Sequence, residues 1–160
     1  MNADMIVTLI ESSRDQLVRT AQAVPDARLN WRPLDNGRTV LDLLGDAAQS
    51  PQMATLFLGA GSEKPSPDAM RQWFQKMREE RASWTRDECL QHLQTNMESA
   101  STAIRALSPE QLAEPLTLPM GGGMTLPMGA WWMAIINRSL TARMGQINYI
   151  QTLYGDCAPH

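Results

Sequence analysis

Apolar residues recur every three or four positions along most of the chain, which is the spacing of one face of an α-helix. The N-terminal segment shows this clearly, because its apolar stripe consists of Met5, Ile6, Leu9, Ile10, Leu17, Val18 and Ala21. Similar stripes, together with residues that start or stop helices, predict four long helices and one short one. We expect these helices over residues 4–24, 40–61, 68–82, 85–107 and 126–154.

The second helix carries both a start signal and a break. Thr39, followed three residues later by Asp42, is typical of a helix N-cap. Pro51 lies inside the helix, where it lacks a backbone donor and crowds the carbonyl of Ala47. We therefore expect a kink over residues 47–50.

The segment EPLTLPMGGGMTLP, residues 114–127, interrupts the helical spacing with three glycines and three prolines. These turn formers predict a small hairpin or an irregular loop. We expect Thr125 to cap the last helix and Gly155 to end it. The elements together predict an all-α fold, an antiparallel four-helix bundle with one additional short helix. We expect one domain over residues 1–156 and a tail over 157–160.

Composition and charge exclude several classes of protein. A chain of 160 residues fits one domain, and a net charge of -3 leaves no broad basic surface of the kind that binds nucleic acid. No apolar run approaches the roughly 20 residues that span a bilayer, and the N-terminus lacks the basic start of a signal peptide. We therefore expect a cytoplasmic protein without nucleic-acid or membrane partners. Cys89 and Cys157 show no CxxC spacing, and we expect Cys89 in the core and Cys157 in the exposed tail.

Three polar residues lie near the centre of the apolar stripe of the last helix: Ser139, Arg143 and Gln146. A guanidinium group that leaves water needs an acidic partner, because an unpaired charge in apolar surroundings is too costly. On the second helix, Asp46 shares a face with the apolar residues Leu43, Met53 and Phe57. The pattern therefore predicts an ion pair between Arg143 and Asp46.

Two motifs give the chain a family resemblance. A Trp-x-Pro motif, Trp31 to Pro33, precedes the second helix, and a Gly-Gln-x-x-Tyr motif with Gly145, Gln146 and Tyr149 lies in the last helix. In order and separation these motifs resemble the DinB/YfiT-like superfamily of metal-dependent enzymes over nearly the whole chain. The resemblance implies a helical bundle that holds a divalent metal, often nickel or zinc, on three histidines. One histidine belongs to the second helix and two, spaced i and i+4, to the last.

At the positions that match those three histidines, this chain has Asp46, Ser139 and Arg143. Its two histidines, His92 and His160, lie on a polar helix face and at the last residue. Arginine cannot bind a cation, and an aspartate with a serine makes a poor site. We therefore expect no bound transition metal and no other cofactor, with Arg143 paired to Asp46 where the ion would lie.

Two interpretations of this site remain open. It is either a pocket that binds a small anionic or polar molecule on Arg143, or a structural ion pair that fills the old cavity. The periphery of the pocket would include Trp31, Gln49, Trp132 and Gln146. The first hypothesis for function is a small-ligand-binding or protein-interaction scaffold that forms a homodimer. The alternative is an enzyme of the family, a thiol-dependent transferase or a hydrolase, with an altered active site.

Overall fold

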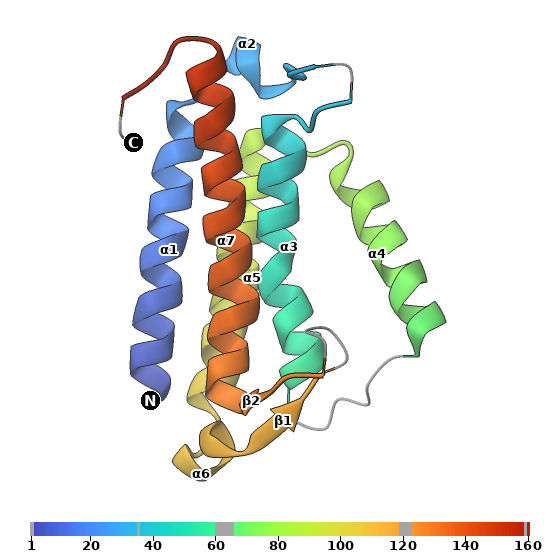
Figure 1. Cartoon of the computed structure of the whole chain (residues 1–160), viewed down its shortest axis with the longest axis vertical. Coiled ribbons are helices and arrows are strands. Elements are labelled where there is room, and N and C mark those ends of the chain that lie inside the picture. The colour runs from blue at the N-terminus through green and yellow to red at the C-terminus, as the bar shows by residue number, and fades with distance from the viewer. Residues whose placement is uncertain (1, 35, 60–65, 119–122, 159) are drawn as a thin grey trace.

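The computed structural model describes residues 2–34, 36–59, 66–118, 123–158 and 160, and its main feature is a four-helix bundle (Figure 1). The four long helices are α1 (Ala3–Ala23), α3 (Val40–Leu58), α5 (Arg86–Arg105) and α7 (Met128–Leu153). The most extensive packing is between α3 and α5, followed by α7 against α1 and α3. The expected all-α bundle is confirmed.

The four long helices do not simply alternate in direction along the chain, as they would in an up-and-down bundle. The helix α4 (Pro67–Arg81) returns along the outside of the bundle, so α5 begins at the same end as α3 and runs beside it in the same direction (Figure 1). Likewise α1 and α7 run parallel to each other and antiparallel to the other pair (Figure 1). As a result α7 packs between α1 and α3, and α4 lies outside α3.

Side-chain caps start these helices where the sequence indicates. The Thr39 side chain accepts a hydrogen bond from the backbone N–H of Asp42 at 3.1 Å, which confirms the N-cap of α3. Thr85 and Glu88 form a reciprocal capping box at the start of α5. Gly155 follows α7 with a φ of 93°, a left-handed conformation that favours glycine.

Pro51 does not interrupt α3, which stays a single helix from Val40 to Leu58. Pro51 cannot donate to the carbonyl of Ala47, but the Ser50 hydroxyl donates to that carbonyl at 2.8 Å. The buried carbonyl is therefore satisfied locally. The expected end of this helix, residues 60–61, lies outside the described residues.

The segment before α7 contains small elements that the sequence pattern located only in part. Of the two alternatives, a hairpin or an irregular loop, the structure has a hairpin of β1 (Pro115–Thr117) and β2 (Thr125–Pro127), with Leu116 opposite Leu126. The prediction that Thr125 caps the last helix is wrong, because Thr125 pairs with Thr117 in the hairpin and α7 begins at Met128. Two short helices were not anticipated, α2 (Asp26–Leu29) and α6 (Pro109–Ala113).

The buried face of α7 is rotated from the stripe that the sequence predicts. A stripe centred near Ser139 would include Ala142 and Leu153 and leave out Leu140 and Gln151, but Leu140 and Gln151 are buried and Ala142 and Leu153 are exposed. The three polar residues therefore lie along the margin of the buried face. Ser139 and Arg143 are half-buried there, and Gln146 is exposed.

The two cysteines occupy the surroundings that the sequence predicts. Cys89 is fully buried, and burial raises the pKa of its thiol to about 12, so the thiol stays neutral and unreactive. Cys157 is exposed. In the part of the chain that the structure describes, none of the helices has both the length and the apolar character needed to cross a membrane.

Candidate functional site

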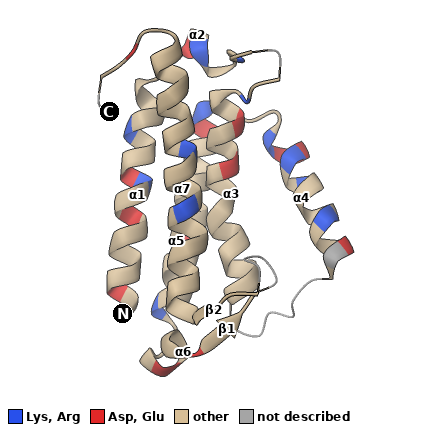
Figure 2. Cartoon of the chain, in the orientation of Figure 1, with Lys and Arg blue, Asp and Glu red and all other residues tan. Residues whose placement is uncertain are grey.

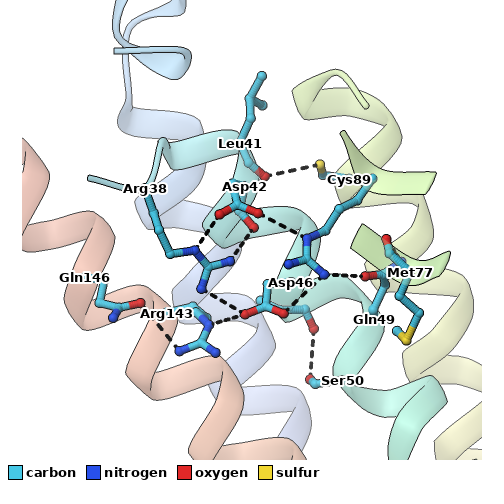
Figure 3. A network of polar contacts seen from close by, with 12 residues as sticks. Arg38, Leu41, Asp42, Asp46, Gln49, Ser50, Met77, Cys89, Arg143 and Gln146 are labelled. Atoms are coloured by element: carbon cyan, nitrogen blue, oxygen red, sulfur yellow. Dashed lines mark hydrogen bonds and ion pairs between the residues drawn. The ribbon is translucent and has the colours of Figure 1, made fainter. Parts of the chain in front are cut away.

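Two aspartates on α3 form the centre of a cluster of charged side chains (Figure 3). Asp42 and Asp46 are one helical turn apart, so their carboxylates lie on the same face of α3. Arg38 is the residue before the N-cap, and its side chain extends along this face of α3. Its Nε donates to Asp42 Oδ2 at 2.5 Å and its Nη1 to Asp46 Oδ2 at 3.1 Å. Arg38 therefore links the two carboxylates.

A second arginine, Arg81, enters the cluster from the end of α4. Its Nε donates to Asp42 Oδ1 at 3.2 Å, and its Nη1 lies 3.4 Å from Asp46 Oδ1. Gly45 favours this approach, because a Cβ at that position would lie 3.1 Å from carbons of the Arg81 side chain, which would have to shift slightly. The Arg81 side chain is only 9% exposed, which shows how closely α4 is held to α3 at this point.

Gln49 strengthens the same junction between α3 and α4. It is buried, its side-chain oxygen accepts from Arg81 Nη1 at 3.0 Å, and its amide donates to the carbonyl of Met77 at 3.0 Å. Both ends of the amide are therefore used by α4. Gln49 lies beside the site as the sequence predicts, and its two hydrogen bonds hold α4 against α3.

The third arginine comes from α7 and forms the contact that the sequence predicts. Arg143 Nε donates to Asp46 Oδ2 at 2.6 Å, and the two side chains are 27% and 24% exposed. Arg143 Nη1 makes a longer contact of 3.5 Å with the Gln146 side chain. We call Arg38, Asp42, Asp46, Arg81 and Arg143 the arginine cluster. Its guanidinium groups outnumber its carboxylates, so it carries one positive charge in excess.

Figure 2 shows where this charge lies in the fold: basic residues occur along both α4 and α7, and the acidic residues of α3 lie between them. Only part of the cluster could be inferred from the sequence. Arg38 lies four residues before Asp42, a spacing that could have indicated their ion pair. The sequence contains no comparable signal for Arg81, because its contact depends on how α4 packs across Gly45.

The cluster shifts the pKa of Asp42 and makes stability depend on pH. Burial raises the pKa of Asp42, but the hydrogen bonds and charges of Arg38 and Arg81 outweigh burial, so the pKa lies below its usual value. A carboxyl group with a lowered folded-state pKa adds stability above its unfolded pKa of about 3.9. This contribution is lost as the pH falls through the folded-state pKa.

We therefore expect Asp42→Asn to lower the melting temperature at pH 7 by about 2–4 °C, a modest effect because the Asp42 side chain is 41% exposed and partly screened. The difference from the wild type should shrink below pH 4 and vanish once the pH lies below the lowered pKa of Asp42. Melting curves recorded from pH 7 to pH 2 test this, with Glu114→Gln as a control at an exposed carboxylate. A difference that stays constant down to pH 2 would show that these ion pairs do not stabilise the fold.

Of the cavities that border the cluster, two are lined by both Ser139 and Arg143 of α7. The first, the inner cavity, has a volume of about 290 Å³ and extends from Asp46 and Ser139 toward Phe74 and Met77 of α4. The second, the outer cavity, has a volume of about 420 Å³ and is lined by residues of α7 and by Met53 of α3. Ser139, Arg143 and Met53 line both cavities, so the cavities meet beside the Arg143 guanidinium group.

The four residues expected at the periphery lie in different surroundings. Trp132 is fully buried in the core, and Trp31 packs edge-on against Tyr154 with the Arg28 guanidinium over its ring. Both tryptophans therefore belong to the packing of the bundle, whereas Gln49 lines the inner cavity. Gln146 alone opens onto solvent, where it lines a shallow apolar cavity near Leu43 and Tyr149.

The donor set of this site does not suit nickel or zinc. Both oxygens of Asp46 already face guanidinium groups, and Arg143 brings positive charge to the place where a cation would bind. Ser139 supplies only a neutral hydroxyl. Within the residues that the structure describes, no three His, Cys, Asp or Glu side chains gather in a group that could hold a metal ion.

Comparisons with known proteins agree with the fold. A solved structure of the mycothiol-dependent maleylpyruvate isomerase matches with a TM-score of 0.69 and 17% sequence identity, over 92% of this chain and 61% of that one. The chain thus spans less than two thirds of the length of that protein. YfiT from Bacillus subtilis, described as having an unusual four-helix bundle topology, matches with a TM-score of 0.67 and 15% identity, over 96% of this chain and 87% of that one.

No curated protein matches the sequence. In a comparison with protein families, the sequence model of the DinB superfamily matches residues 9–147. The match includes all five residues of the arginine cluster. The chain belongs to the DinB superfamily.

Proposed function

We propose that this protein binds a small anionic molecule at Arg143 and does so without a metal ion. The observation that carries the proposal is the position of the Arg143 guanidinium group. Its Nε is held by Asp46, while the side chain borders both cavities. Arginine presents its N–H donors as a planar fork that matches a carboxylate or phosphate. Asp46 therefore orients the group, and its outer nitrogens can receive the anion.

Two further features support an anionic ligand. The arginine cluster keeps one positive charge in excess after its internal pairing. Beside it, the Ser139 hydroxyl makes no hydrogen bond with any residue in the described part of the chain, so it is free to donate to a ligand oxygen. A structural ion pair alone would need neither an open cavity nor an unused donor.

An enzymatic role of the kind named for the fold relatives has less support from the residues. Those relatives are described as a mycothiol-dependent isomerase and a probable metal-dependent hydrolase. In this chain both histidines lie away from Ser139: His92 stacks on Trp84 at 4.0 Å between ring centroids, and His160 pairs with Asp156 near the C-terminus. Ser139 therefore has no histidine base, and Asp46 is held by three arginines.

Anion titration of the purified protein tests the proposal. At constant low ionic strength, we expect acetate and phosphate to bind with Kd values of about 1 mM, as measured by isothermal titration calorimetry. Arg143→Gln should weaken this binding by at least about tenfold. Arg19→Gln, which changes an exposed arginine on α1, should leave it unchanged. Equal binding by the wild type and Arg143→Gln would place the anion elsewhere and overturn the proposal.

Metal analysis of the same sample tests the second half of the proposal. We expect nickel and zinc well below one equivalent per chain by mass spectrometry, because the donor set is filled by arginines. One tightly held equivalent that disappears in Asp46→Asn would contradict a metal-free site.

A further inference from the structure

The outer cavity differs from the inner one in what lies beyond Arg143. The inner cavity continues past Asp46 and is lined both by the polar groups of Gln49 and Arg81 and by the apolar side chains of Phe74 and Met77. The outer cavity continues along α7, where Ala134, Ile135 and Trp131 form an apolar wall. Both start from the same three residues, Met53, Ser139 and Arg143. A ligand whose anionic group lies at Arg143 therefore has an apolar surface available on one side.

The apolar side of the outer cavity is held in place by the fold. The indole of Trp131 donates a hydrogen bond from Nε1 to the carbonyl of Leu116 in β1 at 2.7 Å, which ties the ring to the hairpin. Trp131 is 6% exposed and Ile135 is 8% exposed. Across from them, Met53 is half-buried, and its unbranched side chain can adapt to ligands of different shape. The wall is thus fixed on one side and adaptable on the other.

The polar end of the same cavity has unused donors for an anionic group. Arg143 is oriented by Asp46, and the Ser139 hydroxyl lies on the same face one turn earlier in α7. Arg138 also lines the outer cavity, and its side chain makes no ion pair with any described residue. The cavity is therefore basic at one end and apolar at the other.

We infer that the ligand is an amphipathic carboxylate, with its carboxylate on Arg143 and Ser139 and an apolar chain or ring along Met53, Ile135 and Trp131. This inference rests on the proposed function, because it extends the anion site into the outer cavity. A volume of about 420 Å³ accommodates a chain of several methylene groups or a single aromatic ring. The class of ligand is thus a medium-chain or aryl carboxylic acid.

A series of straight-chain carboxylates tests the inference on the wild-type protein. Calorimetric titration with acetate, butyrate and hexanoate should show affinity rising about threefold per methylene group, because each one leaves water for the apolar wall. Hexanoate should therefore bind at least about 30-fold more tightly than acetate. Hexanol, which lacks the charge, should bind at least about tenfold more weakly than hexanoate, and hexylamine should not bind.

Two matched variants locate the apolar chain. Met53→Gln keeps the length of a half-buried side chain but makes it polar, so the gain per methylene should fall below about twofold. Met133→Gln makes the same change at a half-buried methionine of α7 outside both cavities and should keep the wild-type gain. An unchanged gain in Met53→Gln would overturn the placement of the chain.

The outcomes distinguish a failure of this inference from a failure of the proposed anion binding. If acetate and hexanoate bind with equal affinity and Arg143→Gln loses both, the apolar subsite is wrong. Anion binding at Arg143 would still be supported by that result. If hexanol binds as tightly as hexanoate, the anionic head group is wrong. If Arg143→Gln affects no carboxylate, both the inference and the proposed function are overturned.

Discussion

Changing Ser139 and Arg143 together to histidine is expected to convert the site into one that binds nickel or zinc. The two imidazoles would lie one turn apart on the same face of α7, and Asp46 would supply a carboxylate from α3. Distance favours this arrangement, because Arg143 Nε already lies 2.6 Å from Asp46 Oδ2. Histidine Nε2 is separated from Cα by the same number of bonds as arginine Nε. The double variant also removes one positive charge, while Arg38 and Arg81 continue to orient Asp46.

Calorimetry with nickel and zinc at pH 7.5 should show one site per chain with a Kd of about 10 µM or tighter, at least about 100-fold tighter than in the wild type. Binding should weaken below about pH 6.5, because protonated histidine cannot bind a metal. Ser139→His and Arg143→His alone, and the double variant combined with Asp46→Asn, each lack one ligand and serve as controls. If the double variant binds metal no better than these controls, the three side chains do not converge as the structure describes.

Loss of Asp46 is expected to destabilise the protein more than loss of its partner Arg143. Asp46 forms ion pairs with three arginines, so Asp46→Asn leaves Arg38 and Arg81 to share Asp42 and removes the carboxylate that holds Arg143. We expect this change to lower the free energy of unfolding by about 2–3 kcal/mol, less than for a fully buried pair because both side chains are about a quarter exposed. Arg143→Gln leaves Asp46 paired with Arg38 and Arg81, so its cost should stay below about 1 kcal/mol.

Urea denaturation at pH 7 measures both losses and their coupling. The double variant should lose at least about 0.5 kcal/mol less than the two single losses added together, because the residues are in direct contact. Arg105→Gln, which removes an exposed ion pair with Asp4 on the other side of the bundle, is a control expected to cost little. Equal losses for Asp46→Asn and Arg143→Gln would show that Arg38 and Arg81 do not support Asp46.

Helix positions could be predicted from the sequence because they depend on neighbouring residues. The cap at Thr39 and the stop at Gly155 are local features that the sequence predicts, and the structure confirms both. Thr125 has the same kind of side chain as Thr39 but does not cap a helix. Thr125 instead pairs with Thr117, eight residues away, in the hairpin of β1 and β2, so its side chain is not used as a helix cap.

The candidate site shows the same division between local and distant causes. The contact between Arg143 and Asp46 could be predicted because a charge that leaves water must find an opposite charge. Trp31 and Trp132 could not be placed, because the wall of a cavity and the inside of a core use the same apolar residues. Trp132 proved to be core, whereas Trp131, next to it in sequence, lines the outer cavity.

By itself, the sequence determined the long helices, the N-cap at Thr39 and the contact between Arg143 and Asp46. Only the tertiary structure decided that Arg38 and Arg81 share Asp46 and that two cavities meet at Arg143. The physical reason is the packing of α4 over Gly45, which brings Arg81 against α3 across 35 residues of chain. Periodicity within a helix contains no information about such a contact, because it arises only when separate helices share one surface.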